Sequence, residues 1–225
     1  MSAPSRPSLV GLLLLQPLLF AVPMVVLGQA IGWPGSLRLP AAEILPLIHA
    51  HPGAVQLGYT AYLLVSLAMV PLAFALRGWM AANGQGGWHA DALAFLGAAA
   101  GILKMLGIVR WLSAMPILAA QHATADAAGR ALLEASFTAL NAYAGAVGEL
   151  LGVQLTSGLW FAGIGLALLR AGHRWMGAWG VACGLLFLAT TLRLALPEAA
   201  ALQMVAIPVT LLWFAALAFT FARAK

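Results

Sequence analysis

The stretch that decides the fold is ALAFLGAAAGILKMLGIVRWLSAMPIL, residues 92–118. A helix needs about 20 apolar residues to cross the hydrocarbon of a bilayer, and this stretch is longer. It nevertheless contains two basic residues, Lys104 and Arg110. The length of the stretch predicts a membrane-spanning helix, and its two charges raise the question of what they contact inside a membrane.

The composition of the whole chain agrees with a membrane protein. Of its 225 residues, 63% are hydrophobic and 8% are charged, whereas an ordinary soluble domain has about 25% charged residues. So few charges cannot cover a water-exposed surface, so we predict a single all-α integral membrane domain over residues 1–225, with the lipid bilayer as its partner. Basic residues that flank membrane spans account for the net charge of +5, so no nucleic-acid partner is needed.

Further segments have the length and apolarity of membrane spans. We expect a polytopic membrane helix bundle of about six transmembrane helices, at residues 9–31, 54–76, 92–118, 137–169, 177–196 and 199–222. The first segment could instead be a signal peptide, because residues 28–30 resemble a weak cleavage site, but its apolar run is longer than that of a typical signal sequence.

The charges at the ends of the spans predict the orientation. The side that holds the N-terminus has six basic residues, namely Arg6, Arg77, Arg170, Arg174, Arg223 and Lys225. The opposite side has three, namely Arg38, Arg130 and Arg193. Because positive residues concentrate on the cytoplasmic side, we expect a multi-pass protein of the cell inner (cytoplasmic) membrane with both termini in the cytoplasm.

Two connections on the outer side are longer than turns. Residues 32–53 are expected to contain a short outer helix that is broken at Pro46. Residues 122–136 carry Asp126, Arg130 and Glu134 at successive i, i+4 positions. This charged face predicts a short amphipathic helix that lies on the outer surface and leads into the fourth span.

Helix geometry places the charges of different spans at similar depths. At a rise of 1.5 Å per residue, Arg110 and Arg193 lie about 29 Å, and Glu149 about 31 Å, from the ends of their spans on the N-terminal side. Lys104 lies at a depth of roughly 20 Å on the same count. Three spans thus bring Arg110, Glu149 and Arg193 to one level near the outer edge of the hydrocarbon.

Charges at this depth need partners. An intramembrane charge costs at least about 2.5–3.5 kcal/mol on insertion scales, so such groups pair or line a cavity. Arg193 is close enough to a helix end for its side chain to reach the outer headgroups. We therefore predict that Glu149 pairs with Lys104 or Arg110 between helices. The GAAAG motif at Gly97–Gly101 predicts close packing of helices within the chain rather than dimerisation.

The balance of these charges suggests a binding site. Two or three cations face one buried acid, so pairing leaves at least one cation in want of an anion. We hypothesise a site in the outer half of the bilayer for a small anionic or amphiphilic, lipid-like ligand. Its predicted ligand-binding residues are Lys104, Arg110, Trp111, Tyr143, Glu149 and Trp160. Lys104 and Arg110 would hold the anion, Glu149 would orient them, and Tyr143 and Trp160 would wall the pocket.

Other interpretations of the same residues remain open. The patch could be purely structural or could form a proton or ion path. The protein could also be a membrane-embedded enzyme that acts on a lipid-soluble substrate with Glu149 as general acid/base. A third class is an accessory subunit whose charges meet the helix of a partner. The sequence identifies no catalytic residue beyond this hypothesis, no substrate and no oligomeric state.

Metal and cofactor sites are not expected. His49 and His51 are two residues apart beside Glu43, and such histidines on a helix face different ways. No histidine falls within a predicted span, which argues against a haem held between helices. The single cysteine, Cys183, excludes an internal disulfide.

The third and fourth spans contain two patterns that resemble a known family. These are K-x-L-G-x-x-R-W from Lys104 and Y-x-G-x-x-x-E-x-x-G from Tyr143. They are similar to bacterial six-helix membrane proteins catalogued as a domain of unknown function, number 4386. The resemblance implies a helix bundle but no activity. In that family a histidine often follows the glutamate, whereas Leu150 stands at that position here, which argues against a mechanism that needs an imidazole.

Overall fold

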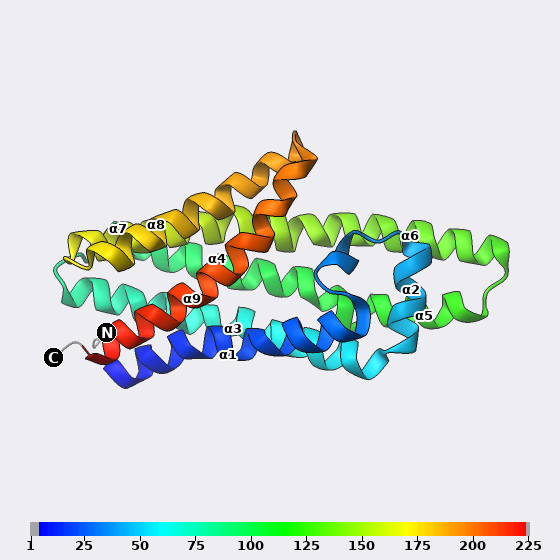
Figure 1. The fold of residues 1–225 in the computed structure, drawn as a ribbon, viewed down its shortest axis with the longest axis horizontal. Helices are drawn as coiled ribbons and strands as arrows, with labels where there is room; N and C mark the ends of the chain where they lie inside the picture. The colour runs from blue at the N-terminus through cyan, green and yellow to red at the C-terminus, as the bar shows by residue number, and fades with distance from the viewer. Residues whose placement is uncertain (1–4, 224–225) are drawn as a thin grey trace.

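The computed structural model in Figure 1 describes residues 5–223, without the side chains of Pro197 and Ala200. In chain order the elements are α1 (Arg6–Ile31), η1 (Gly35–Arg38), α2 (Ala41–Ala50), α3 (Pro52–Ala82), α4 (Trp88–Leu112), α5 (Ala114–Thr124), α6 (Ala127–Gly145), η2 (Ala146–Thr156), α7 (Ser157–Arg170), α8 (Arg174–Ala189), η3 (Thr190–Leu194), η4 (Pro197–Ala201) and α9 (Leu202–Arg223). No strand occurs in this part of the chain, which confirms the predicted all-α class.

Six helical segments are long and apolar enough to cross a membrane. They are Arg6–Ile31, Pro52–Ala82, Trp88–Thr124, Ala127–Arg170, Arg174–Leu194 and Leu202–Arg223. The number and order of these segments confirm the predicted bundle of about six transmembrane helices. The protein is therefore a multi-pass membrane protein.

The long helices lie side by side along the longest axis of the molecule (Figure 1). Helix α3 packs between α1 and α4, and α4 packs against η2. The α8–α9 pair crosses the bundle at an angle, and its η3–η4 corner stands away from the other helices in Figure 1. The start of α1 and the end of α9 lie at the same end of the bundle, which we call the terminal end. Lys225, one of the basic residues of the orientation prediction, lies outside the described residues.

The outer helix expected in residues 32–53 is α2, but it continues through Pro46 to Ala50, so the expected break is wrong.

The amphipathic helix predicted over residues 122–136 is mostly the first part of the fourth long segment, since residues up to Thr124 belong to α5 and α6 begins at Ala127. Asp126 caps α6, since its side chain accepts a hydrogen bond of 2.8 Å from the amide of Gly129. The helix then continues in line through η2 and α7 for 44 residues. At 1.5 Å per residue this is about 66 Å, well beyond the about 30 Å of the hydrocarbon. The start of α6 therefore projects from the bundle beside α5 and α2, opposite the terminal end (Figure 1).

Two clusters of buried side chains form the core. One, toward the terminal end, is built around Trp160, Phe161 and Trp213. The other is built around Tyr59 and Trp111 and continues into α2 and α5.

Candidate functional site

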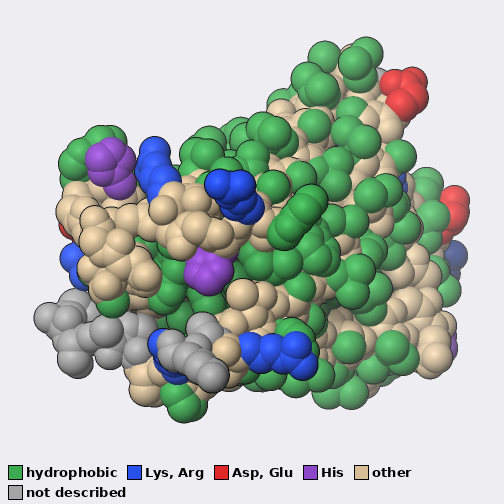
Figure 2. All heavy atoms as spheres, turned by 60° about the vertical axis from the view of Figure 1, so that its left-hand side comes forward, with side chains coloured by type: hydrophobic (Ala, Val, Ile, Leu, Met, Phe, Trp, Pro, Cys, Tyr) green, Lys and Arg blue, Asp and Glu red, His purple; other side chains and the backbone are tan. Residues whose placement is uncertain are grey.

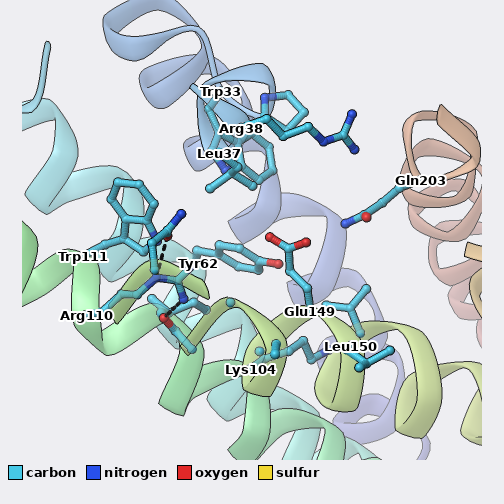
Figure 3. Close-up of a pocket in the computed structure, with 18 of the residues that line it drawn as sticks. Trp33, Leu37, Arg38, Tyr62, Lys104, Arg110, Trp111, Glu149, Leu150 and Gln203 are labelled. Atoms are coloured by element: carbon cyan, nitrogen blue, oxygen red, sulfur yellow. Dashed lines mark hydrogen bonds between the residues drawn. The ribbon is translucent and has the colours of Figure 1, made fainter. Parts of the chain in front are cut away.

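A cavity of about 300 Å³ lies between α3, α4, η2, η3, the start of α9 and the segment that contains η1 (Figure 3). Four of the six predicted site residues line it, namely Lys104, Arg110, Trp111 and Glu149. Arg193, which the depth estimate places at the same level, lines it as well. The third, fourth and fifth spans thus bring their intramembrane charges to one place.

Glu149 lies in a π-helix, the η2 segment of 11 residues. Two hydroxyls complete its end, because Thr156 Oγ1 donates to the Leu151 carbonyl at 2.7 Å and Ser157 Oγ donates to the Gly152 carbonyl at 2.7 Å. π-Helical turns are rare and are found frequently at functional sites. They also change the angle between successive side chains, so the face of this span differs from that of a regular α-helix.

Glycines bring α4 and η2 close together beside the cavity. A Cβ atom built on Gly107 would lie 2.6 Å from the Cα of Gly148, and one built on Gly152 would lie 2.9 Å from the amide nitrogen of Lys104. The predicted intrachain packing of the GAAAG motif is confirmed, because Gly97 faces Trp160 and Ala73. This close approach places Lys104 and Glu149 on adjoining backbones.

The carboxylate of Glu149 is bound to Arg193. Arg193 Nη1 donates to Glu149 Oε2 at 2.8 Å, and the two side chains are 21% and 24% exposed. The prediction that Glu149 pairs with Lys104 or Arg110 is therefore wrong, as is the prediction that Arg193 reaches the headgroups. The physical reason is the 3-10 turn η3 that follows α8, which redirects the chain and which hydropathy does not reveal.

Arg110 has neutral partners. Its Nε donates to Asn141 Oδ1 at 3.1 Å, its Nη1 donates to the Gly107 carbonyl, and its guanidinium carbon lies 5.4 Å from the centre of the Trp111 ring. The residue is 7% exposed. Asn141 was not singled out from the sequence, although an amide inside an apolar span is itself a signal of a polar contact.

Lys104 is half-buried at the cavity wall. Within residues 5–223 it forms no ion pair and no hydrogen bond through its side chain. Figure 3 shows it on the α4 side of the cavity, across from Arg38 and with Glu149 between them. Its ammonium group is therefore available to a molecule in the cavity.

Aromatic residues form another part of the wall. Tyr59 stacks on Trp111 with ring centres 4.8 Å apart, and Trp33 lies edge-to-face with Tyr62 at 6.0 Å. The Tyr59 hydroxyl and the Trp33 indole nitrogen are buried without a hydrogen-bond partner in the described part of the chain. These two groups could donate hydrogen bonds to a molecule in the cavity. Trp33, Tyr59 and Tyr62 were not predicted as site residues.

Two predicted site residues do not line the cavity. Tyr143 is 74% exposed on the outside of α6. It precedes Glu149 by six residues and so lies about 120° around a helix from it. Trp160 is fully buried in the other core cluster, where it packs against Phe161 with ring centres 5.0 Å apart. The π-helix between Glu149 and Trp160 explains why the face expected for a regular α-helix does not hold there.

These features define the class of protein: a six-span membrane helix bundle with a cavity that is rich in basic residues. The chain belongs to the family described as "Domain of unknown function (DUF4386)", whose sequence model matches residues 9–221. The resemblance noted in the third and fourth spans is thereby confirmed. No curated protein and no solved structure matches the chain.

Proposed function

We propose that the cavity binds the anionic group of a small or amphiphilic molecule. The observation that carries the proposal is a charge imbalance. Lys104 and Arg110 line the cavity, and neither forms an ion pair with a carboxylate of the described residues, whereas Glu149 is bound to Arg193. An anion placed between Lys104 and Arg110 would supply the missing countercharge.

The energetics favour such an occupant. An unpaired charge costs about 2.5–3.5 kcal/mol at the centre of a membrane helix on insertion scales, and less toward the helix ends. Hydrogen bonds to charged groups contribute about 1.5–3 kcal/mol, more than neutral ones. A carboxylate or phosphate that accepts from Lys104 or Arg110 would offset the cost of that charge.

The shape and lining of the cavity also suit a ligand. Its volume of about 300 Å³ is at the lower end of the range of small-molecule sites, which are mostly apolar with a few converging polar groups. Aromatic rings form part of its wall, and the Tyr59 hydroxyl and Trp33 indole nitrogen are donors without a partner among residues 5–223. These two donors, like the basic side chains, could bind an anion in the cavity.

Each residue has a distinct role in the proposal. Lys104 supplies a mobile point charge. Arg110 supplies a fixed guanidinium, because Asn141 and the Gly107 carbonyl hold its Nε and Nη1 and leave Nη2 on the Gly145 side of the cavity. Glu149 and Arg193 join η2 to η3 and keep the wall in place.

An enzymatic role and an accessory role have less support. Glu149 would be the acid/base of an enzyme, but its carboxylate is bound to Arg193. The charges of an accessory subunit would face a partner, whereas Arg110 is 7% exposed and lies within the chain's own cavity. We retain the predicted orientation, which places the cavity toward the outer leaflet of the inner membrane.

Thermal unfolding of the full-length protein in a neutral maltoside detergent tests the proposal. Acetate, inorganic phosphate and decanoate serve as anionic probes, and decanol is the uncharged match of decanoate. We expect at least one of the anions to raise the Tm, while decanol does not. Lys104→Met and Arg110→Gln should each weaken this stabilisation about tenfold in concentration, the effect of one charge-assisted contact.

Arg170→Gln is the matched control, because Arg170 is an exposed arginine at the terminal end. It should respond to the anions as the wild type does. Equal stabilisation by decanol and decanoate, or an undiminished anion response in Lys104→Met and Arg110→Gln, would contradict anion binding by these two residues.

A further inference from the structure

We propose that the cavity opens sideways into the bilayer between η3 and α9. Through this opening it admits the anionic head of a single-chain amphiphile, such as a fatty acid, whose alkyl chain remains among the lipids. The inference rests on the proposed function, since it names the chemical class of the ligand and its route.

Two large apolar residues of the cavity lining are exposed. Leu194 on η3 and Met204 on α9 both line the cavity, yet they are 72% and 58% exposed. A side chain that lines a cavity and is also largely exposed lies where the cavity meets the exterior. Gly35 and Arg38 by η1 and Ala142 and Ala146 on the α6–η2 helix also line the cavity and are exposed, but only Leu194 and Met204 are large and apolar, and we call the opening at these two residues the η3–α9 mouth.

The surroundings of the mouth are apolar. Leu192, Leu196 and Val205 lie next to it in the chain and are 54%, 56% and 55% exposed. Figure 2 shows hydrophobic side chains over much of the α8–α9 corner that bounds the mouth. An exposed surface of this kind in a membrane-spanning segment faces lipid rather than water. A ligand that enters here comes from the bilayer.

The packing of the helices leaves room for this route. Helix α9 packs against α1 and α8, whereas in the described residues its contacts with η2 are sparse at most. The η3–η4 corner stands away from the bundle in Figure 1. The ion pair between Glu149 and Arg193 joins η2 to η3 beside the mouth.

Unpaired cations and apolar side chains lie on different sides of the cavity. In Figure 3, Arg110 and Trp111 lie at one side, Leu150 and Gln203 lie at the other, and Glu149 lies between them. Met204 and Ile207 on α9 also line the cavity, as does Arg193, whose charge is paired with that of Glu149. An amphiphile matches this arrangement of side chains if its anionic head contacts Lys104 and Arg110 and its alkyl chain passes Met204.

Size and depth agree with a head-in arrangement. A volume of about 300 Å³ is at the lower limit for a small molecule, so the long chain of a membrane amphiphile must extend through the mouth. Arg110 lies about 29 Å along its span from the terminal end, at the level where lipid headgroups begin. The head of a bilayer amphiphile thus reaches the cavity without leaving its leaflet.

Photo-crosslinking in phosphatidylcholine nanodiscs tests this route with the full-length protein. The probe is a hexadecanoic acid with a diazirine on its chain, and its match is the corresponding hexadecanol. We expect the acid to label residues around the η3–α9 mouth about tenfold more than the alcohol, and Lys104→Met with Arg110→Gln to remove this difference.

Substitutions at the mouth test the path itself. Leu194→Trp and Met204→Trp should each narrow the opening and reduce labelling several-fold. Leu212→Trp is the control, since Leu212 is 61% exposed on α9 and does not line the cavity. Because a tryptophan could disturb folding, each variant is first compared with the wild type by thermal unfolding, and the acid–alcohol comparison on the wild type stands without any variant.

The possible outcomes distinguish a failure of the lateral entry route from a failure of the proposed anion binding. Equal labelling of the mouth by acid and alcohol would overturn the proposal, as would acid labelling confined to the η1 segment. If acetate and phosphate stabilise the protein through Lys104 and Arg110 while the acid probe does not label the mouth, the anion site stands and the lateral route is wrong. If neither occurs, both proposals fail.

Discussion

Arg193 and Glu149, 44 residues apart in the chain, are joined by an ion pair of 2.8 Å that connects η3 to the π-helical η2. Arg193 therefore binds the carboxylate that Glu149 contributes to the cavity lining. It thereby leaves Lys104 and Arg110 without an acidic partner among residues 5–223. The choice of partner thus determines that Lys104 and Arg110 are the cations of the cavity that no carboxylate of the described residues pairs.

The first prediction concerns this ion pair. Glu149→Gln should destabilise the protein by about 1–3 kcal/mol, less than a fully buried pair because both side chains are partly exposed. In a double-mutant cycle measured by unfolding in detergent, Glu149→Gln and Arg193→Gln should couple by about 1–3 kcal/mol.

A cycle between Glu149→Gln and Lys104→Met serves as the comparison and should be additive within about 0.5 kcal/mol. The exposed pair of Arg77 and Asp91, at 2.5 Å, is the matched control, with an expected coupling of about 0.2–1 kcal/mol. Strong coupling of Glu149 to Lys104 instead of Arg193 would show that the ion pair described here is not the one that stabilises the protein.

The second prediction concerns the contact of α4 with η2. Gly148→Ala should destabilise the protein by about 1–3 kcal/mol, the usual cost of overpacking, because the added Cβ would lie 2.9 Å from the Cα of Gly107. Gly11→Ala in α1 meets nothing within 4 Å and should leave the Tm unchanged or slightly raised. Similar Tm values for the two variants would mean that the backbones are not in close contact.

The third prediction concerns the residue that positions Arg110. Asn141→Ala removes the acceptor 3.1 Å from Arg110 Nε, so the guanidinium should lose its fixed direction. We expect the concentration of anion needed for half-maximal stabilisation to rise about tenfold, with a smaller effect on unfolding without anion. Arg110→Lys should behave similarly, because an ammonium cannot reproduce the directed bonds of the guanidinium to Asn141 and Gly107. An unchanged anion response in both variants would remove Arg110 from the site.

The fourth prediction concerns orientation. With Cys183 replaced by serine, a cysteine introduced by Ala128→Cys should react with an impermeant thiol reagent in intact cells. Asn83→Cys should react only after the cells are permeabilised. Both positions are exposed, at opposite ends of the bundle. The reverse labelling pattern would place the cavity in the cytoplasmic half of the membrane.

Hydropathy and the rise of a helix were sufficient to predict the membrane spans and the depth of three residues that line the cavity. The apolar runs predicted six membrane helices, and counting along them placed Arg110, Glu149 and Arg193 at one level; all three line the cavity. Depth along a helix depends on length alone, so it can be estimated without knowing how the helices pack.

Directions around the helix axis were harder to predict. The π-helix changes the angular order of the side chains after Glu149, so Trp160 lies in the core instead of the cavity. The 3-10 turn η3 brings Arg193 back to Glu149. Trp33 reaches the cavity from a connection outside the predicted spans. None of these features has a hydropathy signal, because each depends on tertiary packing.

Native mass spectrometry of the protein extracted from its own membranes shows whether Lys104 and Arg110 bind an acidic molecule. We expect the wild type and the Arg170→Gln control to carry an acidic molecule as added mass, and the double variant Lys104→Met, Arg110→Gln to carry none. Equal occupancy in all three proteins, or added mass from uncharged lipid alone, would contradict an anion site formed by Lys104 and Arg110.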